Sequence, residues 1–143
     1  MEFLLYLTPI GREIVQNVIR AGYPVRENIE FCKDKNRFGY GNFDKMVICT
    51  KNIKNSGYNL KTYINETVYH EAVHMAHMCN GYKPFNISVK DMPLPWNKLE
   101  DIKKSVKMST ASRQIEHEAY WMEDKPQKVN YVIKKYCFWL WTS

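Results

Sequence analysis

The sequence predicts an α+β fold in a single domain that spans residues 1–143. Three observations support this prediction. The length of 143 residues is typical of one domain with one hydrophobic core. Apolar residues recur at helical spacing near the N-terminus and again through the second half of the chain. Short β-prone pieces separated by turn residues lie between these two regions, and this order of elements is typical of α+β domains.

The first helix is expected over residues 11–21, and Gly22 follows it as a stop signal. Its apolar face is formed by Ile14, Val15, Val18 and Ile19. From Ile29 to Ile53 the pattern changes to the pieces IEFCK, RFGYG and KMVICTKNI, which alternate with turn compositions. These pieces predict a small N-terminal sheet, mixed or antiparallel.

The helical period returns from Thr62 to Asn80, and Gly81 has the position of a left-handed C-cap. Three prolines within residues 82–96 predict a loop, with one short extended piece at FNISVK. Three further helices are expected from WNKLEDIKKSVK, from STASRQIEHEAYWMED with Ser109 or Thr110 as N-cap, and from PQKVNYVIKKYCFWLW with Pro126 in its first turn.

Composition excludes several classes of function. The formal charge of +6 comes mostly from lysines scattered over many segments, which disfavours nucleic-acid binding. No stretch approaches the roughly 20 apolar residues of a membrane span. The N-terminal apolar run contains Glu2 and is interrupted by Pro9, so it is not typical of a signal peptide. A soluble protein of the cytoplasm is therefore expected.

The four cysteines, Cys32, Cys49, Cys79 and Cys137, lie far apart in the sequence and form no C-x-x-C pair. We therefore expect reduced, structural cysteines, as is usual in the cytoplasm. The composition is rich in Lys and Asn, which suits a phage or another AT-rich genome.

The pattern His70-Glu71-Ala72-Val73-His74 lies on the predicted helix of residues 62–80. Residues four apart share one helix face and are separated by about 6 Å along its axis, so His70 and His74 can reach one zinc ion. Glu71 lies beside them as a candidate general base. His77 is almost two turns from His70 and is expected to line the pocket or to support a ligand.

A third ligand is expected from residues 112–123, because a catalytic zinc ion usually has three protein ligands. This segment places Glu116 and Glu118 among apolar side chains, which is costly unless a cation compensates their charge. From the residues alone, either glutamate could be the ligand.

The motif H-E-x-x-H followed by S-R-x-x-E-x-x-A resembles the gluzincins, zinc peptidases with a glutamate as third ligand. The match is closest to heat-shock membrane zinc proteases, the prenyl-protein endoproteases and the mitochondrial protease that matures an ATP-synthase subunit. Ser112, Arg113, Glu116 and Ala119 match the second motif. The resemblance implies a zincin-like fold, metalloendopeptidase activity on a peptide or protein substrate, and one Zn²⁺ per chain held by His70, His74 and Glu116. It covers two short motifs, and Tyr120 replaces the aspartate usual at that position.

The implied reaction assigns further roles. Glu71 would take a proton from the attacking water and pass it to the leaving amine. Tyr120, one turn beyond Glu116, is the expected donor to the oxyanion, with His117 and Arg113 as alternatives. The segment KMVICTKNI is either a strand edge that pairs with substrate backbone or a plain core strand.

Two other functions are compatible with the sequence. The zinc could be structural, with His77 or Glu118 as fourth ligand. Alternatively, the chain could be a metal-free partner-binding protein that uses its basic surface and the aromatic tail YCFWLW.

Overall fold

The computed structural model describes residues 1–42, 44–105 and 110–142. Within them it contains six α-helices, namely α1 (Pro9–Arg20), α2 (Thr50–Asn55), α3 (Leu60–Cys79), α4 (Trp96–Ser105), α5 (Thr110–Met122) and α6 (Pro126–Thr142). The strands are β1 (Val25–Glu27), β2 (Gly39–Gly41) and β3 (Met46–Ile48), and the 3-10 helices are η1 (Glu2–Tyr6), η2 (Glu30–Lys33) and η3 (Val89–Asp91). The predicted α+β class is confirmed.

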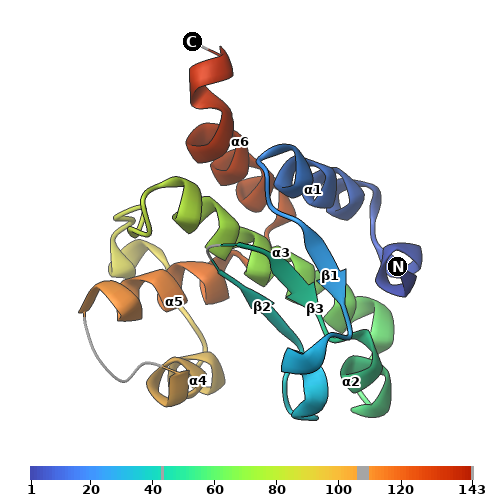
Figure 1. Ribbon diagram of the computed structural model, residues 1–143. Coiled ribbons are helices and arrows are strands. Elements are labelled where there is room, and N and C mark those ends of the chain that lie inside the picture. The colour runs from blue at the N-terminus through green and yellow to red at the C-terminus, as the bar shows by residue number, and fades with distance from the viewer. Residues whose placement is uncertain (43, 106–109, 143) are drawn as a thin grey trace.

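Helix α3 is the centre of the fold. It crosses the molecule behind the sheet, with α1 and α6 towards one side and α4 and α5 towards the other (Figure 1). It contacts α1, α5, α6 and both β2 and β3. Many of its residues are fully buried, among them Val68, Ala72, Val73 and Ala76. The helix that carries the H-E-x-x-H motif is thus held from several sides.

The sheet is mixed and has the strand order β1-β3-β2. β1 pairs in parallel with β3, with Val25 opposite Met46, and β2 pairs antiparallel with β3, with Gly39 opposite Ile48. β1 was not anticipated, because three residues are too few to show an alternating pattern. The predicted strand IEFCK is instead the 3-10 helix η2.

Of the two interpretations of KMVICTKNI, the core strand is confirmed and the strand edge that pairs with substrate is wrong. β3 is the central strand, and Met46, Val47 and Ile48 are 0% exposed. An uninterrupted apolar run is typical of a strand that is buried on both faces. The chain then turns into α2 at Thr50. Among the described residues β2 pairs only with β3, so β2 is the edge strand nearest α3.

Helix boundaries differ from the predicted ones by one or two residues. α1 begins at Pro9, because the Thr8 side chain accepts a hydrogen bond from Gly11 N at 3.1 Å and proline suits a first helical position. The left-handed Gly81 after α3 is confirmed by its φ of 75°. No strand forms at FNISVK, whose end begins η3. The suggested N-cap Ser109 lies outside the described residues.

The prediction of reduced cysteines is wrong, because all four form disulfides, Cys32–Cys49 and Cys79–Cys137. Sequence spacing does not show that the fold brings the Cα atoms of these pairs to 5.4 and 5.1 Å. Disulfides persist mainly in oxidising compartments, so the cysteines do not support a cytoplasmic location. That location and the phage origin stay predictions. In the described part of the chain, no helix has the length and apolarity needed to cross a membrane.

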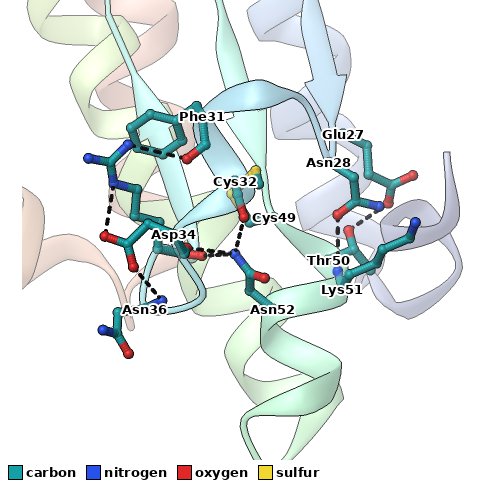
Figure 2. Close-up of a disulfide and its surroundings, with 11 residues drawn as sticks. Glu27, Asn28, Phe31, Cys32, Asp34, Asn36, Cys49, Thr50, Lys51 and Asn52 are labelled. Atoms are coloured by element: carbon teal, nitrogen blue, oxygen red, sulfur yellow. Dashed lines mark hydrogen bonds and ion pairs between the residues drawn. A yellow bond between two sulfur atoms is a disulfide. The ribbon is translucent and has the colours of Figure 1, made fainter.

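The Cys32–Cys49 disulfide belongs to a network that fixes the loop between η2 and β2. Figure 2 shows the Asn52 side chain directed at this loop. Its amide nitrogen donates to the carbonyl oxygens of Cys32, Asp34 and Arg37 at 2.8, 3.0 and 2.9 Å. The disulfide and Asn52 together hold a segment that forms one wall of the cleft described below.

Removal of the Cys79–Cys137 disulfide should destabilise the protein, because this bond joins the end of α3 to α6 across 58 residues. The loop-closure model predicts a loss of about 4 kcal/mol for the double Cys→Ser variant, against about 3 kcal/mol for the 17-residue separation of Cys32 and Cys49. Urea unfolding of both variants would measure this. An unfolding free energy equal to that of the parent protein would contradict the prediction.

Glu27 should contribute stability that depends on pH. Its carboxylate accepts from Glu2 N at 2.9 Å, Phe3 N at 2.8 Å and Thr50 Oγ1 at 2.6 Å. Burial raises the pKa of Glu27, but these hydrogen bonds outweigh it and the net pKa is lowered. A lowered folded-state pKa stabilises the protein above the unfolded pKa of about 4.3, and this stability is lost as the pH falls through the folded-state value.

The Glu27→Gln variant should therefore lose about 1–2 kcal/mol of unfolding free energy at pH 7 and show a flatter acid dependence below pH ~4. Glu30→Gln is the control, because Glu30 is exposed on η2 and its ion pair is with exposed Lys33 at 2.7 Å. Equal acid sensitivity of the parent and Glu27→Gln in chemical unfolding would show that Glu27 has no such role.

Candidate metal centre

The structure brings His70, Glu71 and His74 together on α3. Asn59 caps this helix by accepting a hydrogen bond from Thr62 N at 2.9 Å. One ligand atom from each of the three residues lies within 4.8 Å of the others. The imidazole centroids of His70 and His74 are 5.0 Å apart. These three side chains are therefore close enough together that they could hold one metal ion.

Glu116 on α5 faces both histidines of the motif. Its carboxylate oxygens lie 3.1 Å from His74 Nε2 and 3.9 Å from His70 Nε2. Burial raises the pKa of Glu116, but the hydrogen bond to His74 and the charges of the histidines outweigh it and lower the pKa to about 2. The same contact raises the pKa of His74 against the effect of burial. The carboxylate is thus ionised at neutral pH and directed at the two nitrogens that would bind a metal.

Glu118, the alternative ligand, points elsewhere. It is fully buried, and one of its oxygens lies 2.9 Å from His77 Nε2. It accepts hydrogen bonds from Phe85 N at 2.9 Å, Ile87 N at 3.2 Å and Gln114 Nε2 at 2.9 Å. Backbone and side-chain donors therefore compensate the buried charge that sequence reasoning had assigned to a cation.

His77 supports this second cluster rather than lining the cleft. It is fully buried, and its ring stacks on Phe85 at 4.2 Å between centroids. Burial lowers the pKa of His77, so the neutral ring donates from Nε2 to Glu118. It contacts the H-E-x-x-H motif through the ring of His74, with the two ring centroids 5.6 Å apart.

Glu123 contacts the candidate site in a way that sequence reasoning missed. Its Oε1 lies 2.8 Å from His70 Nδ1, and its Oε2 lies 3.2 Å from Lys98 Nζ. A carboxylate on the outer nitrogen fixes the ring and leaves Nε2 free to bind a metal. Burial, the hydrogen bond to Glu123 and its charge raise the pKa of Glu66 to about 7. The signal in the sequence was the spacing of seven residues from Glu116, which places Glu123, directly after the end of α5, on the side of the helix that carries Glu116.

The side chain of Glu71 packs under β2. A Cβ atom at Gly39 would lie 3.0 Å from Glu71 Cγ and 2.6 Å from a Thr67 methyl carbon, and one at Gly41 would lie 2.8 Å from the Glu71 carbonyl oxygen. Glycine at both positions lets the edge strand approach the motif closely. Burial raises the pKa of Glu71. A carboxyl group with a raised pKa is better suited to accept a proton and release it again.

The three candidate oxyanion donors separate in the structure. Tyr120 is half-buried, and its ring meets His70 edge-on at 4.7 Å between centroids. His117 is turned away, with Nε2 2.8 Å from the carbonyl oxygen of Met92. Arg113 is exposed. Of the three, Tyr120 lines the same cleft as His70.

This cleft has a volume of about 960 Å³ and runs along the first turns of α3. His70, Glu71 and Glu123 are among the residues that line it. Its walls come from the loop before β2, from α2 and from the start of α4, and include Arg37, Asn52 and Lys98. The motif is therefore open to a ligand larger than water on the side of Glu71.

The donor set suits zinc. Two imidazole nitrogens and one carboxylate oxygen converge, with the ionised Glu116 already in contact with His74. Zinc accepts nitrogen and carboxylate ligands, and three protein ligands leave one position for chemistry. Glu123 contacts Nδ1 of His70 while Nε2 faces the metal position, and metal-binding histidines usually have such a carboxylate on their second nitrogen.

Comparison with known proteins gives a family but no activity. A family model described as a domain of unknown function (DUF8637) matches residues 3–138, so the chain belongs to this family. No curated protein and no solved structure matches the chain.

Proposed function

We propose that this protein is a zinc-dependent metalloendopeptidase of the gluzincin type, with His70, His74 and Glu116 as zinc ligands. One observation carries the proposal, namely that the Glu116 carboxylate faces the Nε2 atoms of both His70 and His74. The two sequence motifs also support it, because they lie on separate helices that are far apart in the sequence, yet α3 and α5 are in contact.

In this proposal, Glu71, Glu123 and Tyr120 have separate roles around the three ligands. When bound, a zinc ion polarises a peptide carbonyl and lowers the pKa of water. Glu71 accepts a proton from the attacking water at its carboxylate and delivers it to the nitrogen of the leaving amine. Glu123 holds the Nδ1 side of His70 and so keeps Nε2 directed at Glu116. Tyr120, in ring contact with His70, is the donor to the oxyanion.

The structural-zinc alternative has less support. It needs a fourth protein ligand, for which the sequence offered His77 or Glu118. These two side chains are hydrogen-bonded to each other, and Glu118 also accepts hydrogen bonds from the backbone N–H groups of residues 85 and 87. The cleft beside Glu71 favours an open fourth position instead.

Activity can be tested with an unfolded, reduced and alkylated protein as substrate. The zinc-loaded protein should create new peptide N-termini, detected by mass spectrometry. A chelator should abolish cleavage, and added zinc should restore it. Intact substrate after prolonged incubation with fully zinc-loaded protein would overturn the proposal.

A further inference from the structure

Three aromatic side chains, Phe38, Tyr58 and Tyr63, form a wall of the cleft, here called the aromatic wall. The rings of Tyr58 and Tyr63 are stacked, with centroids 4.6 Å apart and planes 16° apart. The ring of Phe38 meets them edge-on at 6.3 and 6.2 Å. The three residues come from the loop before β2, the α2–α3 loop and α3, so the fold assembles them from separate segments.

The aromatic wall presents apolar surface to the cleft. Phe38 and Tyr63 pack partly against the core, but Tyr58 is 56% exposed. Neighbouring lining residues are polar, among them Asn52 and Asn55. An exposed aromatic surface within a polar cleft is typical of a ligand-binding position.

The aromatic wall lies at a defined distance from the motif. Tyr63 precedes His70 by seven residues on α3, which corresponds to about 10 Å along the helix axis. Phe38 directly precedes β2, whose Gly39 and Gly41 lie against Glu71. An extended peptide advances about 3.3 Å per residue, so 10 Å corresponds to about three residues. A peptide lying beside β2 would thus reach the aromatic wall about three residues from the site of reaction.

We propose that the aromatic wall binds an aromatic side chain of an extended peptide substrate, about three residues from the bond that is cleaved. The inference rests on the proposed function and adds a substrate class to it. An aromatic ring would stack on the exposed face of Tyr58, an arrangement that contributes beyond the burial of area alone. The rest of the cleft is lined by polar residues, so we expect weaker preferences for the side chains at the other substrate positions.

Cleavage-site mapping tests the position. After digestion of unfolded proteins, aromatic residues should be enriched several-fold at one position about three residues from the cleaved bonds. Tyr58→Ala should remove the enrichment, and Tyr58→Phe should keep it because the ring is retained. Tyr131→Ala is the matched control, since Tyr131 is 62% exposed on α6 and does not line the cleft. Cleavage without any aromatic preference would overturn this inference and leave the proposed activity intact.

Direct binding separates the two proposals if cleavage fails. The probes are capped nonapeptides of alanine, serine and glycine with either phenylalanine or alanine at the centre. The Glu71→Gln variant should bind the phenylalanine peptide roughly tenfold more tightly, and the double variant with Tyr58→Ala should lose this difference. Equal affinity for both peptides would overturn the inference whatever the outcome for hydrolysis.

Discussion

The Glu71→Gln variant should lose peptide hydrolysis by about 100- to 10,000-fold and keep its zinc. Glu71, the carboxylate of the H-E-x-x-H motif, is not one of the three proposed ligands, and it lines the cleft beside β2. Glutamine preserves its shape and its packing under Gly39 and Gly41, but it cannot accept the proton of the attacking water. Initial rates of peptide cleavage and zinc content should be measured on the same preparation.

Glu30→Gln is the control for this variant, because it makes the same chemical change at an exposed residue of η2. It should cleave at the rate of the parent protein. Parent-like hydrolysis by Glu71→Gln would show that another group acts as the base. Loss of zinc together with activity would instead show that Glu71 holds the metal.

The His74→Ala variant should lose bound zinc almost completely. It removes one of the two imidazoles and also the hydrogen-bond partner of Glu116 at 3.1 Å. The half-buried Glu116 carboxylate then loses the contact that keeps its pKa low, which adds a cost to the folded state. Elemental analysis gives the zinc content, and thermal unfolding shows whether the variant is folded.

His117→Gln is the matched control for the metal, because His117 is also buried and hydrogen-bonded but contacts the Met92 carbonyl instead of the site. It should retain zinc even if it is less stable. Full zinc occupancy in folded His74→Ala would contradict the ligand assignment.

The sequence could predict the parts of the site that depend on helical period. His70, Glu71 and His74 lie within one long helix, so their relative positions follow from 3.6 residues per turn. The choice between Glu116 and Glu118 could not be predicted from the residues alone, because it depends on how α5 is rotated about its axis. Packing of buried Ile115, Ala119 and Met122 sets that rotation and directs Glu116 at α3.

Contacts between residues far apart in the chain could not be predicted from the sequence. The bond between Glu123 and His70 joins residues 53 apart, and the Cys79–Cys137 disulfide joins residues 58 apart. No local pattern indicates either contact. The sheet was predicted only in outline, because strands of three residues are too short for periodicity and the edge position of β2 depends on pairing across the chain.

The zinc content of the parent protein and of Glu116→Ala, purified without chelator and measured by elemental mass spectrometry, tests the central claim most directly. We predict about one zinc ion per parent chain and a clear loss in the variant, because three protein ligands are typical of a catalytic zinc site. A parent protein that takes up no zinc even when it is supplied, or a Glu116→Ala variant with full occupancy, would contradict the proposed metal centre.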